Sequence, residues 1–116
     1  MAARGLAAFQ AALLGGGLLP PELLAEMRRT VDTGGEDIRY GLGLMEVDLP
    51  CGTAVGHDGG IAGCASVAVS LPDGGRDAVL LVNADATSAL SAALWQWVAS
   101  ALCGSDAAVA PALARG

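Results

Sequence analysis

The stretch that decides the fold is "IAGCASVAVSLPDGGRDAVLLVN", residues 61–83. From 61 to 71, larger apolar side chains alternate with small or polar ones, which is typical of a strand with one buried face. The "PDGG" that follows is a strong turn signal. Residues 77–83 have an unbroken apolar centre, which indicates a strand covered on both faces. We therefore expect a hairpin whose second strand lies centrally in its sheet.

Helical patterns flank this hairpin on both sides. The sequence predicts a short helix at 5–14, which three glycines end, and a second at 21–31 that opens on Pro20–Pro21. A long helix is expected over 86–103, followed by a polar, alanine-rich tail at 105–116 that should be frayed. The side chains expected to pack the long helix on the sheet recur at helical spacing: Leu90, Leu94, Trp97, Val98 and Leu102.

Two further strands complete the expected sheet. Residues 39–47 alternate weakly, "DLPCG" turns the chain, and 53–57 form a short extended piece. The order of elements predicts an α+β fold, an antiparallel β-sheet with flanking helices. We assign residues 1–104 to one domain and leave the tail outside it.

Composition excludes several classes of function. The net charge is -6, and all six basic residues are arginines without a cluster, so a nucleic-acid-binding surface is not expected. The three cysteines fit no zinc spacing, and a single histidine gives a metal too few ligands. We expect no metal and no cofactor.

Two apolar segments could be mistaken for a signal peptide or a membrane span. Residues 1–19 begin like a signal peptide, but Gln10 and three glycines interrupt them and no small-x-small cleavage site follows. Residues 86–103 carry no charge, yet their serines, threonine and glutamine are too polar for a membrane span. We expect no membrane span. A small secreted or membrane-associated protein stays the weakest alternative, and the compartment stays open.

His57 is the only histidine, and glycines surround it in "GHDGGIAG", residues 56–63. Most histidines in such loops are merely solvated. An imidazole can nevertheless exchange a proton near neutral pH if a cleft surrounds it. Gly59 and Gly60 would let a ligand approach the backbone closely.

At this point the motifs become recognisable as a set. "YGLGL" at 40–44, "CG" at 51–52, "GHDGGIAG", "PDGG", "LVNA" at 81–84 and a helix ending in "CG" stand in a specific order and spacing. They resemble the C-terminal portion of the serine β-lactamase and D-alanyl-D-alanine carboxypeptidase superfamily, most of all the secreted carboxypeptidases and class C-like esterases. "FQAALLGGGLLPPELLAEM" at 9–27 is also similar, so the resemblance covers residues 6–104. It implies a partial β-lactamase-like domain.

The resemblance implies roles for four consecutive residues. His57, Asp58 and Gly59 match the Lys- or His-Thr-Gly motif on the strand that borders the active site. His57 would then be catalytic, near the nucleophile and the substrate carboxylate, and the N–H of Gly60 would be an oxyanion-hole donor. Asp58, Gly59 and Gly60 would bind substrate. Asp58 departs from the usual threonine or serine, and its charge would repel a substrate carboxylate.

The family's nucleophile and its partners are not encoded here. Ser-x-x-Lys cannot occur without a lysine, and Tyr40, the only tyrosine, is followed by Gly41–Leu42 rather than completing Tyr-x-Asn. We therefore expect a truncated acyl-transfer hydrolase, of β-lactamase, carboxypeptidase or esterase type, that is inactive alone. The alternative is a non-catalytic binding module or pseudoenzyme that binds a small molecule or peptide.

The same resemblance implies a disulfide between two of the cysteines and an unpaired edge on the strand at 77–83. Cys51 and Cys103 occupy places similar to a disulfide pair in the exported carboxypeptidases, the alternative being two buried thiols. Cys64 is expected to be a small packed residue. In the family, the strand that matches 77–83 pairs with an N-terminal strand that this sequence lacks. Its edge would then be open to self-association.

Overall fold

The computed structural model describes residues 2–34, 37–72 and 75–104. The helices of these ranges are α1 (Ala3–Leu14), α2 (Pro21–Met27) and α3 (Ser88–Cys103). The strands are β1 (Val31–Asp32), β2 (Ile38–Tyr40), β3 (Met45–Leu49), β4 (Gly52–Ile61), β5 (Cys64–Leu71) and β6 (Arg76–Val82). The predicted α+β class is confirmed. The expected tail at 105–116 lies outside the described residues.

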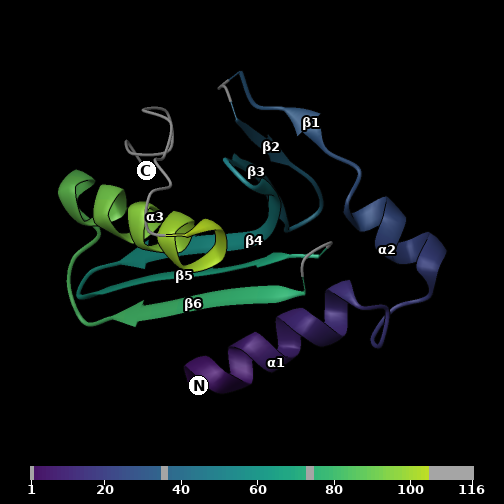
Figure 1. Ribbon diagram of the computed structural model, residues 1–116, viewed down its shortest axis with the longest axis horizontal. Coiled ribbons are helices and arrows are strands. Elements are labelled where there is room, and N and C mark those ends of the chain that lie inside the picture. Colours follow the sequence, from purple (N-terminus) through teal and green to yellow (C-terminus); the bar gives the residue numbers. More distant parts are fainter. Residues whose placement is uncertain (1, 35–36, 73–74, 105–116) are drawn as a thin grey trace.

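The described strands form one sheet in the order β1-β2-β3-β4-β5-β6, and each neighbouring pair is antiparallel. Helix α3 lies across β4 to β6, while α1 runs beside β5 and β6 (Figure 1). Ala54 belongs to the apolar cluster under α3, and the next residue, Val55, belongs to the cluster under α1. Because successive side chains of a strand point to opposite faces, the two helices cover opposite faces of the sheet.

The α3 face holds the main core. Thr87 caps the helix by accepting a hydrogen bond from the Leu90 N–H at 3.1 Å, and Arg76 donates to the Leu102 carbonyl at its other end. Trp95 is only 2% exposed, whereas Trp97 is 41% exposed. The expected packing of Trp97 is therefore wrong: the helix turns Trp95 inward, beside Leu94 and Val98. Of the other expected core residues of α3, Leu94, Val98 and Leu102 are buried, and Leu90 is partly buried against the same cluster.

The α1 face holds a smaller cluster of Leu13, Leu44 and Val55. Gln10 is buried in the same layer, and its Nε2 donates to the Ala68 carbonyl at 2.7 Å. This amide ties α1 to the middle of β5.

The two strands of the 61–83 stretch differ from their predicted environments. β5 was expected to have one exposed face, but from Ala65 to Leu71 all residues except Ser66 are buried, because α1 covers its second face. The apolar pattern of 77–83 alone predicts a central strand, but β6 is the last strand of the described sheet, which leaves its edge open as the family resemblance implies, and Leu81 is 43% exposed. The apolar pattern of a strand shows which side chains are suited to burial. Which of them are buried depends on the helices and strands that pack against it.

Several element boundaries also differ from the predictions. The strand expected at 39–47 is two strands, since Gly41 to Leu44 form a turn in which Gly43 has a φ of 77°. The helix expected at 21–31 ends at Met27, whose carbonyl accepts the Leu42 N–H at 3.0 Å. The short piece expected at 53–57 is the longest strand, β4.

A disulfide joins Cys51, in the turn after β3, to Cys103 at the end of α3. The predicted pairing is confirmed, and it fastens the start of β4 to the α3 face. Cys64 is a free, exposed thiol, so the expectation that it is packed is wrong. Within the described ranges, no helix is long and apolar enough to cross a bilayer.

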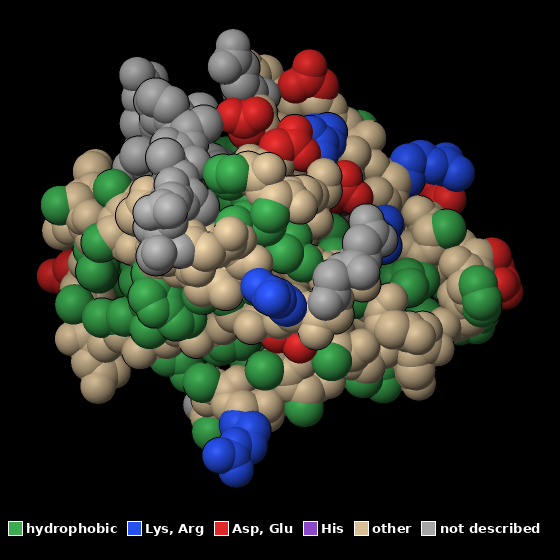
Figure 2. Space-filling view, viewed as in Figure 1, with side chains coloured by type: hydrophobic (Ala, Val, Ile, Leu, Met, Phe, Trp, Pro, Cys, Tyr) green, Lys and Arg blue, Asp and Glu red, His purple; other side chains and the backbone are tan. Residues whose placement is uncertain are grey.

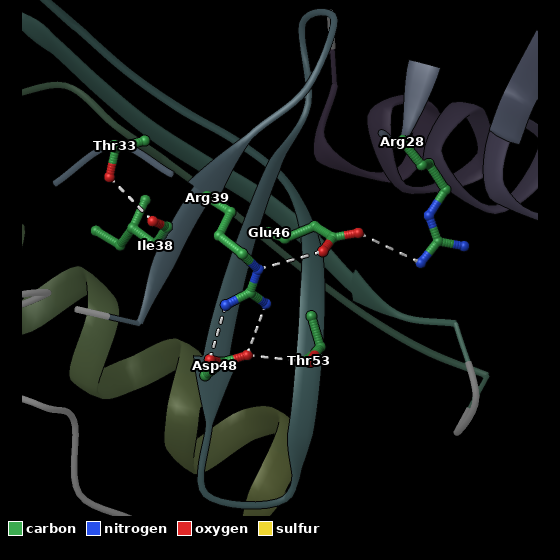
Figure 3. Close-up of polar contacts among 7 residues, drawn as sticks. All are labelled: Arg28, Thr33, Ile38, Arg39, Glu46, Asp48 and Thr53. Carbon is green, nitrogen blue, oxygen red and sulfur yellow. Dashed lines mark hydrogen bonds and ion pairs between the residues drawn. The ribbon is translucent and has the colours of Figure 1, made fainter. Parts of the chain in front are cut away.

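Charged side chains gather over β1 to β3, away from the mostly uncharged α3 (Figure 2). Arg39 forms two hydrogen bonds of 2.9 Å with the carboxylate of Asp48, and its Nε lies 3.6 Å from Glu46 (Figure 3). Arg28, just after α2, reaches Glu46 from the other side at 3.9 Å. This cluster fastens α2 to the small strands that precede β4.

Candidate functional site

The four predicted site residues, His57 to Gly60, lie in the second half of β4. His57 stands opposite Ala68 of β5, and its side chain is 49% exposed. It lines a cavity on the α1 face together with residues of that helix. Asp58 is partly exposed, and Gly59 and Gly60 are exposed. The catalytic and substrate-binding roles of these four residues stay predictions.

One edge of β4 is open along these residues. β3 pairs with β4 only through Gly52 to Gly56, so within the described chain the segment 57–61 pairs with β5 alone. In an antiparallel ladder, alternate residues turn their N–H and C=O away from a given neighbour. The open edge therefore offers backbone hydrogen-bonding groups, the arrangement to which an extended ligand main chain can add.

Tyr40 is a site residue that the sequence reasoning missed. Its Oη lies 2.8 Å from Nε2 of His57, and the two rings meet edge to face with centroids 5.5 Å apart. Tyr40 ends β2 opposite Met45, which in turn stands opposite Gly56 of β4. In the sequence, Tyr40 stands out only as a tyrosine that does not complete Tyr-x-Asn. The signal that could have found it is the short hairpin "YGLGLM" at 40–45. This hairpin places Tyr40 across β3 from Gly56, the residue before His57.

The contacts of His57 select one tautomer of its neutral ring. Nδ1 is hydrogen-bonded to the backbone carbonyl of Asp58, and a carbonyl oxygen can only accept. Nδ1 therefore carries the hydrogen, and Nε2 accepts from the Tyr40 hydroxyl. Tyr40 and Asp58 account for the polar contacts of His57 in the described chain, so none of the described serines is placed to be activated by this imidazole.

Gly60 lies where the loop between β6 and α3 touches β4. A Cβ at this position would come within 2.6 Å of the Ala86 Cβ, so a side chain would displace that loop. Asp85 of the same loop accepts the Gly63 N–H at 2.6 Å, in the turn between β4 and β5. The glycine thus keeps the strand edge close to the N-terminal end of α3, where a cavity of about 220 Å³ reaches Asp58 and Ser91.

A second cavity, of about 270 Å³, opens on the other face of β4. Helix α1 supplies its apolar wall through Leu6, Phe9 and Leu13. The strands supply a polar end, which includes His57 and Asp58. His57 and its neighbour thus border a groove lined by the sheet rather than open solvent.

The electrostatics of the neighbouring strands are dominated by Arg39. Its hydrogen bonds to Asp48 hold the pKa of that carboxyl below its usual value, although burial acts in the opposite direction. The same bonds raise the pKa of the Arg39 guanidinium above its ordinary value. Within the described residues, no group of three or more metal-ligating side chains could hold a metal ion.

Solved structures of two amide hydrolases resemble this chain, although no family model matches its sequence. A D-stereospecific amidohydrolase from Streptomyces sp. is 45% identical with a TM-score of 0.65, over 71% of this chain and 25% of the enzyme. The D-amino acid amidase from Ochrobactrum anthropi SV3 complexed with L-phenylalanine amide is 26% identical, with a TM-score of 0.59 over 70% of this chain and 24% of the amidase. Its complex with D-phenylalanine gives the same identity and a TM-score of 0.60, over 70% and 28%.

The chain therefore spans about a quarter of the length of these enzymes. Both belong to the penicillin-binding and β-lactamase-like serine hydrolase superfamily, which is the superfamily that the sequence motifs resemble. A specific likeness to D-alanyl-D-alanine carboxypeptidases or class C enzymes stays a prediction. The antiparallel sheet with its flanking helices matches the C-terminal part of the β-lactamase-like fold of these enzymes.

Proposed function

We propose that this chain supplies one wall of the acyl-transfer site of a serine hydrolase that cleaves amides of D-amino acids. The observation that carries the proposal is the open edge of β4 at 57–61, bordered by the only histidine of a chain 45% identical to a D-stereospecific amidohydrolase. Substrate main chain would lie along this edge, where alternate backbone groups are free to bind it.

Each residue of the β4 edge has a proposed role. The N–H of Gly60 would donate to the oxygen that becomes negative in the tetrahedral intermediate, a contact whose loss costs about 10²–10³ in kcat in comparable enzymes. His57, held by Tyr40 in one tautomer, would present a fixed ring edge to the reacting groups. Gly59 and Asp58 would contact substrate. A cleft of this kind orients the substrate amide and stabilises the developing negative charge. These residues do not supply the nucleophile that attacks the amide carbonyl.

The attacking groups must come from elsewhere. These 116 residues contain no lysine, so Ser-x-x-Lys is absent, and Tyr40 does not stand in a Tyr-x-Asn sequence. Without a nucleophile and its base, only the small rate enhancement of an oxyanion hole would be left. We expect the isolated chain to release no ammonia from D-phenylalanine amide and to form no acyl-enzyme with an ester or with nitrocefin. Turnover with a serine adduct detected by mass spectrometry would contradict this.

Fragment complementation tests the proposal. The Streptomyces amidohydrolase, shortened by the quarter that this chain matches, would be mixed with this chain and assayed for ammonia release from a D-amino acid amide. We expect activity from the mixture and from neither part alone, with the Gly60→Ala chain lowering it because the added methyl displaces the loop at Ala86. A mixture that stays inactive although the parts associate would favour the alternative, a non-catalytic binding module.

We also propose that the edge of β6 takes a strand from a second polypeptide, either another copy or the missing part of the enzyme. β6 pairs only with β5 in the described chain, and Leu81 is exposed on it. An apolar strand with an unpaired edge promotes association. Light scattering should give a mass above that of one chain at tens of micromolar, and Leu81→Lys should lower it. A sharp monomer peak for the unmodified chain would overturn this part of the proposal.

A further inference from the structure

Gln10 is a polar side chain in an otherwise apolar stretch of α1, "LAAFQAALL" at 6–14. It is only 5% exposed, and with Leu13 it makes up the buried residues of this helix. Its Nε2 donates to the Ala68 carbonyl, while its Oε1 is buried without a hydrogen-bond partner among the described residues. The amide cannot be turned round, because two acceptor oxygens would then face each other. Gln10 is therefore fixed in one orientation that leaves an acceptor unpaired.

An amide placed in this way adds little stability. A buried acceptor without a partner carries a desolvation penalty comparable to the gain from the bond to Ala68. Methionine has a similar length and would fill the same space without an unpaired oxygen. Local conflicts of this kind are expected at functional sites, where position matters more than stability. The explanation for Gln10 should therefore be sought in what its amide holds.

The carbonyl that Gln10 binds belongs to the register partner of His57. Ala68 of β5 stands opposite His57 of β4. One residue earlier the two strands come unusually close, since a Cβ on Gly56 would overlap the Ala68 oxygen and lie 2.7 Å from the Val69 Cα. Helix α1, β4 and β5 therefore meet at one carbonyl group, directly beside the candidate site.

Gln10 and His57 also line the same cavity. The His57 side chain is 49% exposed, so packing alone does not fix its ring. The ring is held by two hydrogen bonds, one to the Asp58 carbonyl and one to the Tyr40 hydroxyl. The first depends on the backbone of β4 at 57–58, and the second depends on where β4 lies relative to β2. Both bonds therefore require β4 to be held in place at this point.

We infer that Gln10 is a positioning residue for His57. Its amide holds the Ala68 carbonyl to α1, and this fixes where β4 lies beside β5. The imidazole is thereby kept against Tyr40 in a single tautomer. The inference rests on the proposed function, in which His57 presents a fixed ring edge to the reacting groups. Helix α1 then contributes to the site through one buried hydrogen bond, without touching the substrate.

NMR of the full, isotope-labelled chain tests the inference, because His57 is the only histidine and Gln10 is one of two glutamines. The nitrogen-15 shifts of the ring give the ratio of the two neutral tautomers at about pH 8.5, where an ordinary imidazole is uncharged. Gln10→Met removes the amide and keeps the length of the side chain. Leu13→Ala, in the next turn of α1, is the matched control: it removes buried apolar volume and leaves the bond to Ala68.

In the unmodified chain we expect the tautomer with hydrogen on Nδ1 to dominate. Gln10→Met should lower its ratio to the other tautomer by about fivefold, the size of one neutral hydrogen bond, while the urea midpoint should change little. Leu13→Ala should lower the midpoint and leave the tautomer ratio of the folded chain unchanged. A second measurement needs no variant: the side-chain amide protons of Gln10 should exchange with solvent at least about tenfold more slowly than those of the exposed Gln96.

An unchanged tautomer ratio in Gln10→Met, or the same change in Gln10→Met and Leu13→Ala, would overturn the inference. A Gln10→Met chain that does not fold would also overturn it, because the amide would then serve the core. So would Gln10 amide protons that exchange as fast as those of Gln96. Complementation of the shortened amidohydrolase is scored by ammonia release, and it can fail while these NMR results stand. The two proposals therefore fail on different readouts.

Discussion

The two faces of the sheet differ in how completely they are built. Under α3, twelve buried residues form one cluster, the helix is capped at both ends, and a disulfide fastens it to the start of β4. Under α1, the buried cluster has three members, a cavity of about 270 Å³ lies beside it, and Gln10 leaves a buried oxygen unpaired. The α3 face therefore holds the larger core, with a cavity of about 220 Å³ only at the N-terminal end of α3, whereas the α1 face has the smaller and less completely packed cluster.

This division separates variants that unfold the chain from variants that change its site. Substitutions on the α3 face should lower the free energy of unfolding while leaving the His57–Tyr40 contact intact in the folded fraction. Substitutions near His57 should do the opposite, because His57 and Asp58 are at least partly exposed and contribute little buried area.

The largest effect is expected from the two tryptophans of α3. Trp95→Ala should lower the free energy of unfolding by about 3–5 kcal/mol, because it removes a buried aromatic ring and leaves a cavity. Trp97→Ala, two residues along the same helix, should cost less than about 1 kcal/mol, because Trp97 is 41% exposed and lies outside the buried cluster. Urea unfolding followed by circular dichroism measures both. Similar losses for the two variants would contradict the observed orientation of α3.

The disulfide should give the next largest effect. Cys51→Ser with Cys103→Ser opens a loop with a sequence separation of 52 residues. The chain-entropy model then predicts a loss of about 4 kcal/mol, and removal of a native disulfide typically costs about 2–5 kcal/mol. Thermal unfolding with and without a reducing agent measures it, with Cys64→Ser as the matched control that should not respond. A double variant as stable as the oxidised chain would show that packing alone holds α3 to β4.

Sequence patterns predicted the α3 face better than the α1 face, for a physical reason. Burial under α3 follows periodicities of two and 3.6 residues that are visible in 61–71 and 86–103. The disulfide came from the family resemblance. Even here the buried face of the helix is wrongly predicted, because Trp97 is expected in the core and Trp95 is buried instead. Both residues are apolar, so only packing against the sheet determines which of them is buried.

The α1 face could not be predicted in the same way. Burial on both sides of β5 depends on a helix that lies 50 or more residues earlier in the chain, as the Gln10–Ala68 bond shows with its separation of 58. The Tyr40–His57 contact depends on strand register rather than on any local motif. His57 to Gly60 were found as candidates because glycines around a lone histidine are visible in sequence, but their partners were not.

A smaller effect is expected from Tyr40→Phe. It removes the hydroxyl that donates to Nε2 of His57 and keeps the edge-to-face ring contact. Because a partly exposed hydrogen bond is worth about 0.5–1.5 kcal/mol, unfolding should change little. The imidazole should instead gain the tautomer with hydrogen on Nε2, which nitrogen-15 NMR of the ring distinguishes. Trp97→Ala serves as the control that leaves the ring unchanged. An unaltered tautomer in Tyr40→Phe would mean that the Asp58 carbonyl alone sets it.

The smallest effect is expected from the charged side chains of β2 and β3, which lie at the surface beside the main core. Arg39 holds the pKa of Asp48 below its unfolded value of about 3.9, so this carboxylate stabilises the folded chain above that pH. The contribution disappears as the pH falls through the folded-state pKa. It should be less than about 1 kcal/mol, because both side chains are partly exposed. Urea midpoints between neutral and strongly acidic pH should therefore fall slightly less for Asp48→Asn than for the unmodified chain, whereas Asp32→Asn on β1 should follow the unmodified chain. Identical acid sensitivity in all three would show that the Arg39–Asp48 pair orders β2 and β3 without stabilising them.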